Sequence, residues 1–151
     1  MGFATDANLL LYSVHRESEY HLGAKAFIEE CMAGSETWAI PWPVAHAFLR
    51  ISTHTSIFPH PLTIAQAVSV IDRLGSLPHV QFIGEKAGFW GAYQPMLLAR
   101  QARGNSVPDT LVAALLFNHG ITTLYTKDKD FLRFEGLKVI DPLKTRKGEG
   151  G

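Results

Sequence analysis

The stretch that decides the fold is FATDANLLLY, residues 3–12, in which an acid directly follows a short apolar run. Residues 3–5 predict a strand, and Asp6 lies at its carboxyl end. In open parallel sheets, ligands bind outside the carboxyl ends of the strands. We therefore expect Asp6 to lie at a functional site.

Farther along the chain, short strand-like runs alternate with helical stripes of apolar residues. We expect further strands at residues 37–40, 80–83, 123–126 and 138–140, and helices at residues 24–32, 44–53, 64–74, 85–103 and 108–119. This alternation is typical of a mainly parallel sheet flanked by helices. The predicted fold is α/β, and 151 residues correspond to one domain.

Two more acidic positions lie at the edges of predicted elements. Asp109 falls in the first turn of a predicted helix, and Asp128 follows the strand predicted at 123–126. Carboxylates about 4 Å apart repel by roughly 4 kcal/mol at an effective dielectric near 20, so a cluster with Asp6 requires a cation or a shared proton. The three acids together favour a metal-dependent nuclease. Taken singly, Asp109 is equally well a helix-end acid, and Asp128 and Asp130 are equally well turn residues.

Composition limits the alternatives. Lysine plus arginine total 14 against 14 acidic residues, so nucleic-acid binding would depend on a local basic patch and a metal. The lone Cys31 lies in an apolar helical stripe, which predicts a buried thiol and a reducing compartment. There is no apolar run of the roughly 18 residues that a membrane span needs. We expect a soluble, cytoplasmic protein with no membrane contact.

Two other chemistries fit the sequence less well. Seven histidines invite a zinc site, but they show no HExxH spacing and the chain has one cysteine. The opening Asp6-Ala7-Asn8 is similar to that of aspartyl-phosphate phosphatases, which typically have a second aspartate where Asn8 stands. Neither zinc chemistry nor phosphatase chemistry is favoured.

Several segments resemble the PIN-domain ribonucleases, in particular the VapC toxins of bacterial and archaeal toxin-antitoxin systems. The resemblance covers nearly the whole chain and is carried by residues 6–12, 40–50, 107–109, 126–137 and 141–143. It implies a three-layer α/β/α PIN-like domain, which we assign to residues 1–143. Residues 144–151 are polar and glycine-rich, and we expect a flexible tail there.

The resemblance also implies an activity, which is hydrolysis of RNA phosphodiesters by an endoribonuclease that uses Mg²⁺, with Mn²⁺ as a substitute. Carried over by motif, Asp6, Asp109 and Asp128 match the metal ligands. Asp130 matches a supporting catalytic acid, and Asn8 and Thr126 match polar neighbours that orient the site.

Partners follow from the same resemblance. They are a small VapB-like antitoxin whose tail crosses the acidic cleft, an RNA substrate of the tRNA or rRNA class, and a second copy in a homodimer. Arg50, Lys127 and Arg133 are candidates to guide the RNA backbone. Trp42 and Trp90 could stack on bases, although their spacing favours the hydrophobic core.

One position departs from the family pattern. The family usually has a glutamate just before Phe-Leu-Arg in the helix after the second strand, and here that position is Ala47. Alanine ligates no metal, so either this is a naturally weakened copy or the glutamate was removed deliberately. The departure also permits a rival hypothesis, a catalytically silent PIN-like module that binds RNA or an antitoxin.

Overall fold

The computed structural model of the protein describes residues 2–143, so the tail expected at 144–151 lies outside the described residues. A five-stranded sheet with the strand order β3-β2-β1-β4-β5 forms its centre. Every strand pairing is parallel. The strands are β1 (Gly2–Thr5), β2 (Thr37–Pro41), β3 (Val80–Ile83), β4 (Thr123–Tyr125) and β5 (Lys138–Ile140).

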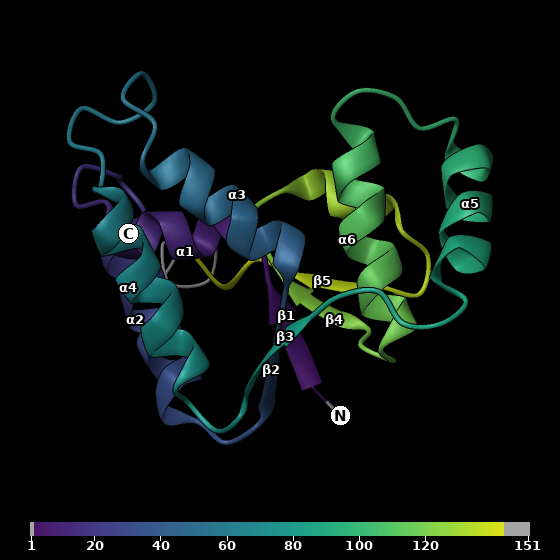
Figure 1. Ribbon diagram of the computed structural model, residues 1–151, viewed down its shortest axis with the longest axis horizontal. Helices are drawn as coiled ribbons and strands as arrows, with labels where there is room; N and C mark the ends of the chain where they lie inside the picture. Colours follow the sequence, from purple (N-terminus) through teal and green to yellow (C-terminus); the bar gives the residue numbers. More distant parts are fainter. Residues whose placement is uncertain (1, 144–151) are drawn as a thin grey trace.

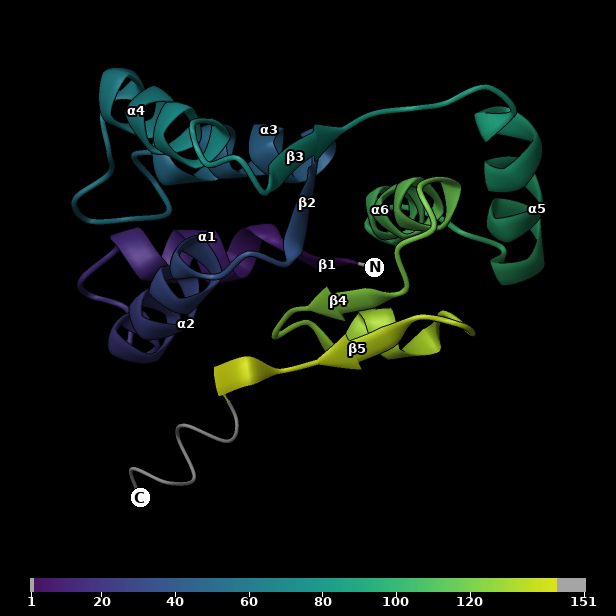
Figure 2. The same cartoon turned by 90° about the horizontal axis from the view of Figure 1, so that it is seen from below.

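Helices cover both faces of this sheet. They are α1 (Ala7–Val14), α2 (His21–Ala33), α3 (Trp42–Ser52), α4 (Ile64–Gly75), α5 (Phe89–Arg100) and α6 (Ser106–Asn118), with a 3-10 helix η1 (Lys129–Arg133) before β5. Helices α1 to α4 gather on one side, and α6 lies on the other with α5 outside it (Figures 1 and 2). The predicted three-layer α/β/α fold with a parallel sheet is confirmed.

Local sequence signals account for several helix ends. Thr63 caps α4 through a reciprocal capping box with Gln66, because each side chain accepts a hydrogen bond from the other's backbone amide. Pro43 lies in the first turn of α3, where its missing N–H has no helical partner to lose. Gly120 has φ of +72° just after α6, a conformation that favours glycine at helix ends.

Helix α1 was not expected from the sequence. Its run Leu9-Leu10-Leu11 is continuously apolar, so it lacks the alternation of faces that marks an amphipathic helix. All three leucines are buried in the core, between the sheet and the helices α2 and α3 that pack on α1. Because the three consecutive leucines are all buried, the sequence has no helical period of apolar residues from which α1 could be predicted.

Core membership was predicted correctly for Cys31 and wrongly for two tryptophans. Cys31 is buried, but Trp42 and Trp90 are 52% and 60% exposed. The fully buried tryptophan is Trp38 on β2, whose indole N–H donates to Thr5 Oγ1 at 2.9 Å. Within residues 2–143, no helix combines the length and apolar character that spanning a membrane requires.

The parallel sheet sets the place of the acidic residues. All strands end at the same edge, so the segments after β1 and β4, which are neighbours in the sheet, begin side by side. The backbone amide of Asp6 donates to the carbonyl of Tyr125 at 3.0 Å, which ties the two strand ends together. Residues 6–8 and 126–130 are thereby brought into contact across more than a hundred residues of sequence.

Candidate metal centre

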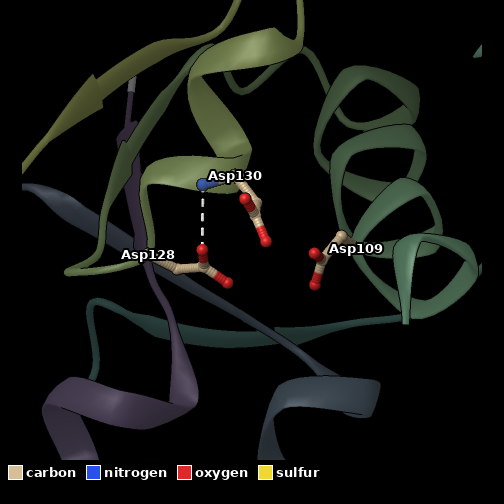
Figure 3. Close-up of side chains that lie close together, drawn as sticks. All are labelled: Asp109, Asp128 and Asp130. Carbon is tan, nitrogen blue, oxygen red and sulfur yellow. Dashed lines mark hydrogen bonds between the residues drawn. The ribbon is translucent and has the colours of Figure 1, made fainter.

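Three carboxylates meet at this edge of the sheet. Asp109 extends from the first turn of α6, while Asp128 and Asp130 come from the segment that starts η1. One oxygen from each lies within 4.8 Å of the others, and Figure 3 shows the three side chains directed toward a common space. Asp128 also caps η1, because its Oδ1 accepts the Asp130 amide at 2.9 Å. We name Asp109, Asp128 and Asp130 the acidic triad.

Asp6 lies beside the acidic triad and is held more tightly. Its Oδ1 accepts the amide of Ala7 at 2.8 Å, as the N-cap of α1, and its Oδ2 accepts the Thr126 hydroxyl at 2.9 Å. Among residues 2–143, Asp6 is not part of the group whose oxygens lie within 4.8 Å of one another. Two of the three predicted metal ligands, Asp109 and Asp128, therefore meet in the triad together with the predicted supporting acid Asp130.

Thr126 joins the two parts of the site. Its hydroxyl donates to Asp6 Oδ2 and accepts from Asn8 Nδ2 at 3.1 Å and from the Asp128 amide at 3.0 Å. A hydroxyl has one donor and two acceptor lone pairs, so the hydroxyl of Thr126 makes all the hydrogen bonds that it can. It is buried, and it fixes the side chains predicted to lie around it. Asn8 Oδ1, also buried, has no hydrogen-bond partner among the described residues.

The crowding of carboxylates changes their protonation. Burial, followed by the charges of Asp128, Asp6 and Asp130, raises the pKa of Asp109 to about 6, and Arg133 opposes this. Burial likewise raises the pKa of Asp6, while the hydrogen bonds from Ala7 and Thr126 work in the opposite direction. Without a cation, these two acids therefore keep their protons to a higher pH than an exposed aspartate does.

The position of the missing glutamate lies on α3. Ala47 is half-buried and packs against the hydrophobic core, so α3 supplies no carboxylate at this point. Helix α3 contacts α6, which carries Asp109. The role predicted for this position stays a prediction.

The three predicted RNA-guiding cations lie in different surroundings. Arg50 is exposed in the last turn of α3. Arg133 Nη2 lies 3.0 Å from Asp130 Oδ1, next to the acidic triad. Lys127 Nζ donates to Asp141 Oδ2 at 2.9 Å and lies 4.4 Å from the centre of the Tyr20 ring. The sequence analysis did not identify Asp141 as the acid that holds Lys127 in place. Asp141 directly follows β5, and a position directly after a strand is the same signal that identified Asp6.

Comparison with known proteins decides the family. No protein-family model matches the chain. Ribonuclease VapC48 of Mycobacterium tuberculosis is 39% identical over 142 residues, which are 94% of this chain and 98% of that protein. The chain belongs to the VapC ribonuclease family. Ribonuclease VapC37 of the same species is a more distant VapC, 28% identical over 137 residues that cover 91% of this chain and 94% of that one.

Solved VapC structures share the fold. VapBC2 from Rickettsia felis, bound to a DNA fragment from its promoter, superposes with a TM-score of 0.63 at 20% identity, covering 93% of this chain and 98% of that one. VapC20 of Mycobacterium tuberculosis, a sarcin-ricin loop cleaving toxin, gives a TM-score of 0.63 at 15% identity, covering 87% of this chain and 93% of that one. The recognition of a VapC-like PIN fold from sequence is confirmed.

Proposed function

We propose that this VapC protein is a metal-dependent endoribonuclease and the toxin of a type II toxin-antitoxin system. The observation that carries the proposal is the acidic triad with Asp6 beside it, at the carboxyl edge of a VapC fold. Carboxylates crowded in this way are stable as anions only when a cation neutralises them. The site is therefore built for hydrolysis of phosphodiesters, whose developing charge a cation also neutralises.

The donor set fits Mg²⁺, with Mn²⁺ as a substitute. It consists of carboxylate oxygens only, and the orphaned Oδ1 of Asn8 is a further oxygen acceptor nearby. Asp109 and Asp128 would hold the ion, with Asp6 and Asp130 as the remaining acids of the site. When bound, such an ion lowers the pKa of water and offsets charge on the phosphate.

The chain's own residues position this site. Thr126 keeps Asp6 in one orientation and holds the Asp128 backbone, so the acids keep their places while substrate binds. Burial and the neighbouring acids raise the pKa of Asp109 to about 6, so a cation competes with a proton at this carboxylate in weakly acidic solution. No protein nucleophile is needed, because water attacks the phosphate.

The partners are proposed from the family. They are a VapB-like antitoxin, an RNA of the tRNA or rRNA class and a second copy of the chain, in the cytoplasm. Support comes from structural neighbours described as VapBC complexes and from the RNA loop named for VapC20. An arginine on the antitoxin tail that crosses the cleft would pair with Asp6 and Asp109 and so inhibit the enzyme.

Ala47 favours a second candidate, the catalytically silent module that binds RNA or the antitoxin without cleavage. In that case the acidic triad would remain but the site would lack a carboxylate on α3. This candidate predicts RNA binding without turnover in any divalent cation.

The test is cleavage of total tRNA and rRNA by the purified chain in Mg²⁺ and in EDTA. Asp109→Asn removes a carboxylate of the triad, and Asp72→Asn is its matched control because Asp72 is an exposed acid on α4. We expect Mg²⁺-dependent cleavage by the parent and by Asp72→Asn only. Undiminished cleavage in EDTA would contradict the proposal, and RNA binding without cleavage by the parent would favour the silent module.

A further inference from the structure

A hollow of about 230 Å³ adjoins the acidic triad. It shares Asp128 and Thr126 with the metal centre and continues along Lys127, Lys129 and Leu132 toward Val139 and Asp141. Pockets for drug-sized ligands measure about 300 Å³ and more, so this hollow suits a smaller group. Its position means that whatever occupies it lies next to the acidic triad.

The polar wall of the hollow carries two cations. Lys127 is fixed, because Asp141 accepts from its ammonium at 2.9 Å and the Tyr20 ring lies 4.4 Å away. Lys129 is exposed and makes no hydrogen bond or ion pair within residues 2–143. A polyanion approaching four carboxylates meets repulsion, which cations beside them reduce. Lys129 therefore has a free ammonium where a neighbouring phosphate would lie.

The lining of the hollow also has an apolar part. Leu132 on η1 is 64% exposed, and Val139 on β5 is half-buried. Leu132 directly follows Phe131, which is 1% exposed and anchors η1 in the core. Lys129 and Leu132 are three residues apart in the 3-10 helix and so lie on one side of it. An apolar surface beside a cation matches the two parts of a nucleotide, an apolar base face and an anionic phosphate.

We propose that this hollow is a nucleotide subsite that receives one nucleotide adjoining the bond that is cut. The base and sugar lie against Leu132 and Val139, and Lys129 contacts the phosphate of that nucleotide. Lys127 is paired with Asp141, so Lys129 is the cation of the lining that is left to contact RNA. This inference rests on the proposed ribonuclease function. It assigns the enzyme's preference for a base beside the cut to the contact with Leu132.

The test combines RNA binding and the mapping of cut ends. Binding of a fluorescein-labelled single-stranded oligoribonucleotide is followed by anisotropy over a range of salt concentrations, with Ca²⁺ present, and cut ends in a long RNA are sequenced. The variants are Lys129→Ala and Leu132→Ala. Their matched controls are Lys138→Ala, an exposed lysine at the amino end of β5, and Ile64→Ala, an apolar side chain 61% exposed on α4.

We expect Lys129→Ala to weaken RNA binding for all sequences and to reduce the salt slope by about one. Leu132→Ala should flatten the base preference at one position beside the cut by about tenfold, an effect typical of a lost apolar contact. Both controls should behave as the parent. Stabilisation by Mn²⁺ should stay unchanged in all four variants, because the acidic triad is intact.

The outcomes separate the subsite from the nuclease. If the parent cleaves RNA and both variants match their controls in binding and in base preference, the subsite is wrong while the nuclease stands. If the parent cleaves nothing but Lys129→Ala still loses salt-dependent binding, the nuclease proposal fails, and the hollow stands as a site that binds a nucleotide of RNA without cleavage. If Lys138→Ala weakens binding as much as Lys129→Ala, the contact is a diffuse charge effect and the subsite is wrong.

Discussion

The β1–α1 junction and the acidic triad are two halves of one site, and they hold their carboxylates differently. Both oxygens of Asp6 accept hydrogen bonds, one from the α1 backbone and one from Thr126. The Asp109 carboxylate accepts none among the described residues, and burial, followed by the charges of three neighbouring acids, raises its pKa. One half is fixed by hydrogen bonds, whereas the other brings three carboxylates together beside one arginine, Arg133.

Because their carboxylates are held differently, the two halves contribute different properties to the site. Hydrogen bonds to a carboxylate stabilise its orientation and its charged form, so the Asp6 half gives the site its geometry. The triad has more carboxylates than neighbouring cations, and such an excess binds cations and protons, so the triad gives the site its affinity for a metal. Substitutions in the two halves should therefore fail in different ways.

The largest effect is expected in the acidic triad. Asp109→Asn should lower Mg²⁺-dependent RNA cleavage by more than about 100-fold, because losing an outer-shell partner already costs about 10- to 100-fold and a direct ligand should cost more. Initial rates at saturating RNA measure it, with Asp72→Asn as the control. A loss of less than tenfold would remove Asp109 from the set of ligands.

Substitutions in the Asp6 half should lower RNA cleavage less strongly, and a variant that keeps the hydroxyl at position 126 should keep its activity. Thr126→Val leaves the Asp6 carboxylate and the Asn8 amide without their shared partner, so cleavage should fall by about 10- to 100-fold. Thr126→Ser restores the hydroxyl and should keep most of the activity. Equal rates for the valine and serine variants would show that the hydrogen bonds of Thr126 do not position the site.

Position 47 tests whether the site lacks an acid. Ala47→Glu should raise Mg²⁺-dependent cleavage by about tenfold or more, which is roughly 1.4 kcal/mol of barrier. The same variant should be less stable without metal and should recover with it, because a further carboxylate adds repulsion. The control for contaminating nuclease is Asp6→Asn in the Ala47→Glu background. Unchanged activity would show that this position is not catalytic in this chain.

A smaller effect is expected on stability without metal. The folded pKa of Asp109 is about 6 against 3.8, so the stability linked to its protonation is present below about pH 4 and is lost as the pH rises through 6. Asp109→Asn should therefore melt a few degrees above the parent at pH 7 in EDTA, since ~1 kcal/mol shifts the Tm by about 2–4 °C in a domain of this size. Calorimetry at pH 4 should show that this Tm difference has disappeared. A Tm difference that stays the same from pH 4 to pH 7 would show that the protonation of Asp109 is not linked to stability.

The sequence predicted that the acids of the site lie close together, but it did not predict some of the elements around them. Asp6 and Asp128 were identifiable because strand ends in a parallel sheet converge, and that rule needs only the strands. Helix α1 was missed because burial on all sides removes the amphipathic pattern. Trp42 was placed in the core, but its ring lies outside, stacked on Phe82 with centroids 4.8 Å apart. Which acids lie closest together depends on side-chain geometry, which the sequence pattern does not contain.

The most direct test of the account is calorimetric titration of the purified chain with Mn²⁺ at pH 7.5, because the central claim is that the acidic triad holds a divalent cation. The parent and Asp72→Asn should bind Mn²⁺ saturably with the same affinity, and Mg²⁺ should compete. Asp109→Asn should bind at least about tenfold more weakly, a loss of roughly 1.4 kcal/mol. Equal Mn²⁺ affinity in all three proteins would contradict the account.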